Sequence, residues 1–315
     1  MSINVIRSGG AWFVDRAGAA VAIPTSAGTT AELLADRAAV DRAAAAEIPA
    51  DAVRVGDLAL QSPVTTPCRV VAQMVNYRSH ARESGFDPRH VQTTFFRKAS
   101  NSLTGPADRI VRPGHVRLLD YEVELGLVVG APIPVGTQVT ADTLGEYIAG
   151  LVVANDVSAR DVQLPKGQFY EAKSYPTFTP VGPRLVLLDA GELRRLVDLR
   201  LQLWVNGELR QDRTVADMLT EPPQALTTLA RFQPLHPGDL LLTGTPGGTA
   251  LQAPGRVVEL VAAFLPTPLK WRLFIDKQAG VPQYLHAGDL VTATIATADK
   301  AIDLGVQANV VQDAS

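Results

Sequence analysis

The feature that most constrains how this chain folds is a run of alternating residues at positions 120–130. Read with the two-residue period of a β-strand, the run has an apolar face made of Tyr121, Val123, Leu125, Leu127 and Val129. The opposite face carries Glu122 and Glu124, followed by Gly126. Two neighbouring carboxylates repel each other and resist desolvation, so in a stretch this apolar they need a cation.

Two interpretations of this acidic face remain open from the strand alone. A hard divalent ion held by carboxylate oxygens would satisfy both glutamates, and the small Gly126 would leave room beside it. Alternatively, the face belongs to an antiparallel edge strand and is simply solvated, since such strands often face water on one side.

Composition excludes several classes of protein. The chain has 315 residues and a mass of 33.5 kDa, enough for one large domain or a domain with an appendage. A net charge of -3 without a basic run argues against non-specific nucleic-acid binding. No signal-peptide pattern and no apolar run near the ~20 residues of a membrane span are present. The single cysteine, Cys68, cannot form an internal disulfide, which fits a reducing cytosol. It opens an apolar run and is expected to be buried, which argues against a role as a nucleophile.

The pattern of turns and helices divides the chain into two parts. Residues 1–64 are expected to form a small α+β unit, with a hairpin turning at positions 8–10 and a helix over 31–47 that starts from a Thr29–Glu32 capping box. Residues 65–315 form the main domain. Within it, residues 251–284 are interpreted as a helical insert, with apolar stretches at 257–265 and 271–275.

A short helix after Asn76 carries the first candidate pair. Asn76 is expected to cap this helix and Gly85 to end it. His80 and Glu83 then lie on one helical face, where a carboxylate would orient an imidazole and raise its basicity, as a general base requires. The alternative is an ordinary exposed His–Glu pair, which is common on helices.

Two further charged residues follow buried or aromatic stretches. Asp156 ends a buried strand over 147–156, where it could complete a site or instead cap a helix with Arg160 as its ion-pair partner. Lys173 stands among aromatic residues, either as a surface side chain or as a cation directed into a pocket. The Gly-rich turn over 243–248 could hold an anion, but it lacks the pattern of a P-loop.

Six segments, taken in chain order, together resemble the fumarylacetoacetate hydrolase family: 76–83, 96–100, 119–125, 155–161, 172–183 and 237–246. The resemblance covers roughly residues 65–315. It implies an α+β fold, a mixed β-roll or β-sandwich with flanking helices, and a homodimer. Two departures stand out, since Ala99 replaces a common proline and Pro176 replaces a usual acid. The 251–284 segment is also longer than in minimal members.

The same resemblance implies roles for individual side chains. It places the ligands of Mg²⁺, with Mn²⁺ or Ca²⁺ as alternatives, on Glu122, Glu124 and Asp156. It places catalytic groups on His80, Glu83 and Lys173. It places substrate-binding groups on Arg160, Gln163, Thr177 and Thr245.

The function implied is metal-dependent hydrolysis of a C–C bond in a 2,4-dioxo acid of the acylpyruvate or fumarylacetoacetate type. Two alternatives stay open. One is decarboxylation or isomerisation of 2-oxo or 2-hydroxydienedioate acids in aromatic catabolism. The other is a non-catalytic relative that binds a metal or ligand. The expected partners are a small 2-oxo acid and a second copy of the chain, with neither nucleic acid nor a membrane.

Overall fold

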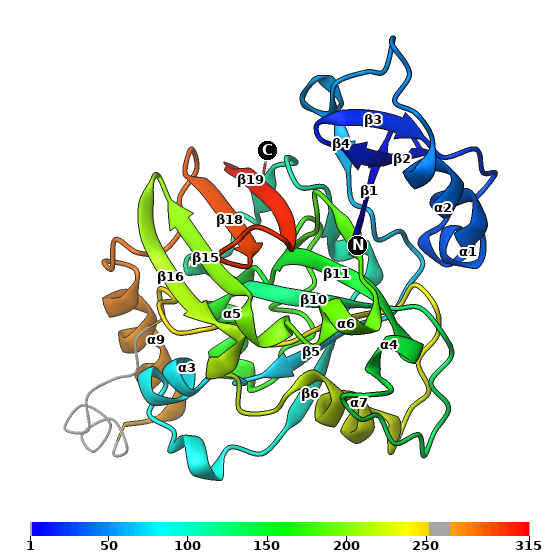
Figure 1. The fold of residues 1–315 in the computed structure, drawn as a ribbon. Helices are drawn as coiled ribbons and strands as arrows, with labels where there is room; N and C mark the ends of the chain where they lie inside the picture. The colour runs from blue at the N-terminus through cyan, green and yellow to red at the C-terminus, as the bar shows by residue number, and fades with distance from the viewer. Residues whose placement is uncertain (1, 252–264, 315) are drawn as a thin grey trace.

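The computed structural model describes residues 2–251 and 265–314, and most of this chain is built around two large β-sheets (Figure 1). The first sheet runs in the order β3 (Ala19–Ala22), β2 (Ala11–Arg16), β1 (Ile3–Ser8), β14 (Leu185–Leu187), β11 (Ile148–Asn155), β10 (Val123–Val129), β17 (Leu240–Leu242), β5 (Val70–Met74) and β6 (Thr94–Lys98), with β4 (Leu60–Gln61) beside β1. The second runs in the order β16 (Glu208–Thr214), β15 (Arg200–Val205), β18 (Leu290–Ala296), β19 (Asp303–Asp313) and β8 (Ile110–Arg112).

Two short ribbons complete the β-structure. One pairs β9 (Leu119–Asp120) with β12 (Ser158–Ala159), and the other pairs β7 (Leu103–Thr104) with β13 (Thr179–Pro180). The pairs β17–β5, β19–β8 and β13–β7 are parallel, and the other pairs named here are antiparallel. The mixed α+β architecture expected from the sequence is therefore confirmed.

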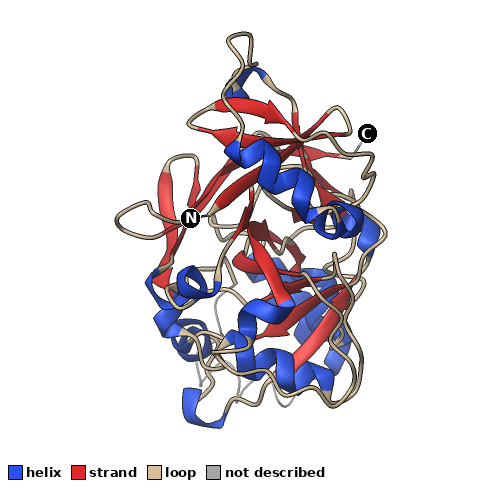
Figure 2. Ribbon diagram, turned by 45° about the vertical axis from the view of Figure 1, so that its right-hand side comes forward, coloured by secondary structure: helices blue, strands red, loops and turns tan. Residues whose placement is uncertain are grey.

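Helices lie around the sheets (Figure 2). They are α1 (Thr30–Ala35), α2 (Arg37–Ala45), α3 (Arg78–Glu83), α4 (Leu144–Tyr147), α5 (Arg160–Lys166), α6 (Ala190–Leu193), α7 (Pro222–Ala230) and α9 (Thr267–Gln278). Short 3₁₀ turns occur at Val55–Asp57, Pro88–His90, Ser100–Ser102, Leu196–Asp198 and Val215–Asp217. Across residues 2–251 and 265–314, no helix is long and apolar enough to cross a lipid bilayer. The predicted helical stretch at 271–275 lies in α9, whereas nearly all of the stretch at 257–265 lies outside the described residues.

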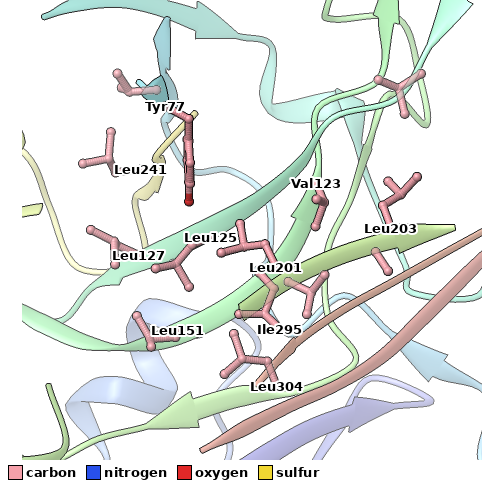
Figure 3. Packing of buried hydrophobic residues seen from close by; sticks show 14 of the residues in the cluster. Tyr77, Val123, Leu125, Leu127, Leu151, Leu201, Leu203, Leu241, Ile295 and Leu304 are labelled. Atoms are coloured by element: carbon pink, nitrogen blue, oxygen red, sulfur yellow. The ribbon is translucent and has the colours of Figure 1, made fainter. Parts of the chain in front are cut away.

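The main core lies between the two sheets. The apolar face of β10 packs in one buried cluster with residues of β15, β18 and β19 (Figure 3). Figure 3 labels members of this cluster from both sheets: Val123, Leu125, Leu127, Leu201, Leu203, Ile295 and Leu304. Alternation along β10 has thus placed every second residue in one continuous apolar layer.

The opposite face of β10 is also buried, and both edges of β10 are paired, with β11 and with β17. Val128 packs there in a second cluster with Val152 and Leu240. The solvated edge strand is therefore excluded, and the two glutamates of this run sit in the interior. A Cβ on Gly126 would lie 2.6 Å from Val152 Cγ2, so this glycine permits close strand packing, and the interpretation that it makes room for an ion is wrong.

The first 64 residues are joined to the main sheet. The predicted hairpin is confirmed as β1 and β2, and the Thr29–Glu32 capping box is present. The predicted helix over 31–47 is instead two helices, α1 and α2, which meet at Asp36. Strand β1 pairs with β14, with Ile3 opposite Leu187, so these residues extend the ten-stranded sheet (Figure 1). The division at residue 64 stays a prediction.

Candidate metal centre

Three carboxylates converge where β10 and β11 lie side by side. Glu122 immediately precedes β10, Glu124 lies within it, and Asp156 immediately follows β11. The antiparallel register sets Val123 opposite Asn155 and so brings the two strand ends together. One oxygen from each carboxylate lies within 4.8 Å of the others, and the three residues are at most 5% exposed. The structure thus brings together the three predicted metal ligands in one buried cluster.

Lys173 contacts two members of this triad. Its Nζ donates to Glu122 Oε2 at 2.6 Å and to Asp156 Oδ2 at 2.7 Å, and it lies 5.3 Å from the centre of the Phe96 ring. Burial opposes the charge of this amine, but Asp156 and Glu122 outweigh it and raise the pKa of Lys173. Lys173 is therefore a buried cation at the site and not a surface side chain.

Arg160 contacts the opposite side of Glu122. Its Nη2 donates to Glu122 Oε1 at 2.5 Å, its Nε donates to Asp120 Oδ2 at 2.8 Å, and its Nη1 donates to Gln163 Oε1 at 2.9 Å. Helix α5 begins at Arg160 and its N-cap is Ala159. The alternative in which Asp156 caps this helix and pairs with Arg160 is therefore wrong.

The charges of the cluster leave one carboxylate without a cation. Three buried cations, Lys98, Arg160 and Lys173, contact Asp120, Glu122 and Asp156. Within the described residues Glu124 forms no ion pair, and its Oε2 accepts a hydrogen bond from Gly244 N at 2.7 Å.

Of the three carboxylates, Glu124 is the one whose negative charge is least stabilised by its surroundings. Burial, together with Asp156 and Glu122, raises the pKa of Glu124 well above its usual value. Glu122 behaves in the opposite way, because Lys173 and Arg160 overcome its burial and lower its pKa. An all-oxygen donor set with an unbalanced negative charge fits a hard divalent cation.

His80 faces this cluster, but it is not paired with Glu83. Its Nδ1 is buried and has no hydrogen-bond partner among the described residues. Burial lowers the pKa of His80 to about 4, partly offset by Glu122. Glu83 accepts a hydrogen bond from Gly248 N at 2.7 Å instead. The expected His80–Glu83 hydrogen bond is thus absent from the described residues, although both side chains project from α3.

Three predicted substrate-side residues are held by the protein itself. Gln163 is buried and accepts from Arg160, as described above. Thr245 is buried, donating from its hydroxyl to Val123 O and accepting from Gln211 Nε2, each at 2.9 Å. Thr177 accepts from Val111 N at 2.8 Å and has a φ of 72°, which is a rare conformation for a β-branched residue. Their substrate-binding roles stay predictions.

Sequence reasoning missed three residues of this region. Lys98 is buried against Asp156 and the carbonyl of Phe178. Asp120 accepts from Arg160 and from Ala250 N, at 2.8 Å in each case. Gln211 accepts from Val123 N at 2.9 Å and donates to Pro246 O at 2.8 Å. Lys98 and Asp120 belong to segments that carry the family resemblance, so their presence there was the available signal. Gln211 lies in none of these segments, so nothing in the sequence pointed to it.

The fold and the site define a β-rich protein with a buried, carboxylate-rich centre suited to a divalent cation. A sequence model of the family described as fumarylacetoacetate (FAA) hydrolase C-terminal matches residues 69–312, and the chain belongs to this family. Members of this family among its relatives carry the names of hydrolases, isomerases and tautomerases.

Individual relatives show how far the similarity extends. Oxaloacetate tautomerase Fahd2a, mitochondrial, from Rattus norvegicus is 35% identical over 67% of this chain and 65% of its own length. A solved structure named as a probable 2-hydroxyhepta-2,4-diene-1,7-dioate isomerase from Mycobacterium abscessus is 28% identical, with a TM-score of 0.74. The fumarylacetoacetate hydrolase from Exiguobacterium antarcticum is 27% identical, with a TM-score of 0.71. Both structural comparisons cover 100% of each chain.

Proposed function

We propose that this protein is a divalent-metal-dependent enzyme that cleaves the bond between C3 and C4 of a 2,4-dioxo acid by hydrolysis. The observation that carries the proposal is the buried triad of Glu122, Glu124 and Asp156, in which Glu124 forms no ion pair with a described residue. A divalent cation bound there, preferably Mg²⁺ or Mn²⁺, would supply Lewis-acid stabilisation of the charge that develops on the 2-oxo acid.

The side chains around the triad suit an anionic substrate. Lys173 places a positive charge beside Glu122 and Asp156, where it can stabilise negative charge that develops on a substrate oxygen. Arg160 holds Glu122 from the other side and keeps Gln163 in place. We assign Gln163, Thr177 and Thr245 to shaping the site, because Gln163 holds Arg160 within α5 while the hydroxyls of Thr177 and Thr245 bind the backbone of other segments.

His80 is the group we assign to proton transfer. The imidazole is neutral near pH 7, and its buried Nδ1 has no hydrogen-bond partner among the described residues, which supports this role. Burial also makes it a weak base, with a pKa of about 4, and Glu122 is the neighbour that most favours its protonated form. In the proposed reaction His80 takes a proton from water, the water oxygen attacks C4, and the C3–C4 bond breaks with its electron pair on C3. Protonation of C3 then yields pyruvate, or a related 2-oxo acid, and a second carboxylic acid.

The experiment is turnover of a panel of acylpyruvates, oxaloacetate and hydroxydienedioates with Mg²⁺ or Mn²⁺, repeated with EDTA. We expect cation-dependent release of a 2-oxo acid and a second acid, and a loss of at least about 100-fold in kcat for His80→Ala, in line with general-base catalysis. Unchanged turnover in His80→Ala would contradict the role of His80. No turnover of any acid would instead favour a non-catalytic, ligand-binding protein.

A second candidate is isomerisation or tautomerisation of the same class of acid. One structural observation favours it: Glu83 is bonded to Gly248 N, and within the described residues no carboxylate bonds to the buried Nδ1 of His80 to orient it for the activation of water. The rat relative is named a tautomerase and the M. abscessus relative a probable isomerase. Loss of the enol absorbance without cleavage, or exchange of C3 hydrogens with deuterium in D₂O, would identify this reaction.

Two further assignments accompany the proposal. We propose that the protein acts as a homodimer in the cytoplasm. We also propose that residues 1–64 pack as a unit on the main domain and that the 251–284 segment influences substrate preference or assembly. Light scattering on the purified full chain tests the dimer. For the segment, deletion should change substrate preference or oligomeric state, and an unchanged result on both counts would rule its role out.

A further inference from the structure

Lys98 is a fully buried lysine next to the triad. It is the last residue of β6, and its side chain has no exposed surface. Its Nζ donates to Asp156 Oδ1 and, at 3.0 Å, to the carbonyl oxygen of Phe178. A lysine is almost never buried this completely unless its ammonium is paired, because desolvation of the charge is costly. The position of this amine is therefore tied to the position of Asp156.

The two oxygens of Asp156 have different partners. Oδ1 accepts from Lys98, while Oδ2 accepts from Lys173 at 2.7 Å. Lys173 also donates to Glu122 Oε2 at 2.6 Å, so Oδ2 is the Asp156 oxygen that shares a lysine with Glu122. Contacts on both oxygens fix the plane of the carboxylate, and the Phe178 carbonyl fixes the amine that holds Oδ1.

We propose that Lys98 is a positioning residue for the cation site, which reserves Oδ1 of Asp156 and directs Oδ2 toward Glu122 and Glu124. The inference rests on the cation site of the proposed function, and it is independent of the reaction catalysed there. Hydrogen-bonding partners of metal ligands commonly contribute 10- to 100-fold to metal affinity, because they hold a ligand atom in the bonding direction.

The sign of the effect separates positioning from simple electrostatics. A lysine beside a cation site repels the cation, so Coulomb's law alone predicts that a neutral residue at position 98 strengthens metal binding. Loss of positioning predicts the reverse, because Asp156 is freed to rotate and Oδ1 loses its partner. Lys98→Met is the appropriate variant, since methionine keeps much of the length of the side chain and removes the ammonium.

The experiment measures the Kd of Mn²⁺ for the full chain by isothermal titration calorimetry, after treatment with EDTA and dialysis. We expect Lys98→Met to bind Mn²⁺ about 10- to 100-fold more weakly than the wild type. Lys98→Gln, which keeps an N–H donor without the charge, should fall between the two. Arg97→Met is the matched control, because Arg97 is the preceding residue of the same strand and its side chain is exposed. Its Kd should stay within about 2-fold of the wild type, since exposed charges are well screened.

Several outcomes would overturn the inference. Binding in Lys98→Met that is unchanged or tighter than in the wild type would show that the amine does not position Asp156. Failure of both Lys98 variants to fold, judged by circular dichroism, would assign the residue to folding alone. Turnover is not used as the readout, so an inactive wild type that binds Mn²⁺ would contradict the proposed reaction and leave the inference intact. An active wild type with unchanged Kd in Lys98→Met would contradict only the inference.

Discussion

The carboxylate of Glu83 accepts a 2.7 Å hydrogen bond from the backbone N–H of Gly248, and this contact joins the end of α3 to the Gly-rich turn that follows β17. The packing leaves no space for a side chain at the turn, because a Cβ on Gly248 would lie 2.0 Å from the backbone oxygen of Arg210. Glu83 therefore acts on the position of the turn, and the pKa of His80 responds to other groups.

Replacing Glu83 with alanine should therefore leave the pKa of His80 nearly unchanged. Loss of a directly paired carboxylate would lower the pKa of a histidine by about one unit or more, whereas we expect less than about half a unit here. Glu122→Gln should lower that pKa, because Glu122 is the carboxylate that most favours the protonated imidazole. NMR titration of the His80 ring in EDTA-treated protein measures both shifts. A fall of a full unit in the pKa of His80 in Glu83→Ala would show that Glu83 does pair with His80.

Replacing Glu124 with glutamine should abolish stabilisation by a divalent cation. At a Mn²⁺ concentration of 100 times Kd, the wild type should gain about 2.7 kcal/mol in the free energy of unfolding, and the variant should gain none. Urea denaturation with Mn²⁺ and with EDTA measures the difference. If the variant still gains stability from Mn²⁺, Glu124 is not a ligand of the cation.

The pH dependence of stability gives an independent measurement on Glu124. In EDTA the folded wild type keeps the proton of Glu124 to a higher pH than the unfolded chain does, because the pKa of this carboxyl is raised. The free energy of unfolding of the wild type should therefore fall, relative to that of Glu124→Gln, as the pH rises above about 4.5, the ordinary pKa of a glutamate in the unfolded chain. Parallel curves for the two proteins between pH 4 and pH 8 would contradict this assignment.

Replacing Arg160 with methionine should destabilise the protein strongly. The side chain is 4% exposed and pairs with Asp120 and Glu122, so its removal leaves uncompensated buried carboxylates. Such losses cost about 3–5 kcal/mol in the free energy of unfolding. The matched control is Arg37→Met, which breaks an exposed pair with Asp41 and should cost about 1 kcal/mol or less. Equal losses in the free energy of unfolding of the two variants would show that the buried ion pairs stabilise the protein no more than the exposed pair does.

Replacing Gly126 with alanine should destabilise the centre of the main sheet. The new Cβ would lie 2.6 Å from Val152 Cγ2 and 3.0 Å from Leu240 Cδ1, and overpacking of this kind costs about 1–3 kcal/mol. The double variant Gly126→Ala/Val152→Ala should recover part of this loss, because it removes the nearer methyl group. Additive losses in the double variant, measured by urea denaturation, would show that the two side chains do not clash.

The local pattern of the sequence was sufficient to predict the β10 strand, but it left the cation and the role of Asp156 open, and the complete triad followed only from the family resemblance. Alternation placed Glu122 and Glu124 on one face, and Asp156 was identified as a residue following a buried strand. The partners of the triad could not be predicted in this way. Lys98 reaches Asp156 because β5 and β6 extend the sheet beyond β10 and β17, and pairing between distant strands leaves no local signal.

Short polar residues were the main source of error. Asn76 was expected to cap α3, yet its side chain donates to Thr220 O and Thr243 O and thereby joins three distant segments. Asp36 was read as part of one long helix, but it ends α1 and begins α2. Asparagine and aspartate bond to nearby backbone or to distant backbone with similar ease, so their neighbours in sequence do not decide between the two.

The pairing of β1 with β14 has a consequence for synthesis of the chain. Ile3 leaves the ribosome before its partner Leu187, which follows roughly 180 residues later. At about 5–20 residues per second, β1 waits roughly 10–40 seconds before β14 exists. During that interval β1 can pair with β2 and β4, and β2 with β3, so only a small sheet of the first 64 residues can form. The side of β1 that pairs with β14 is thus an unpaired sheet edge in the nascent chain, and such edges are where chains tend to pair wrongly.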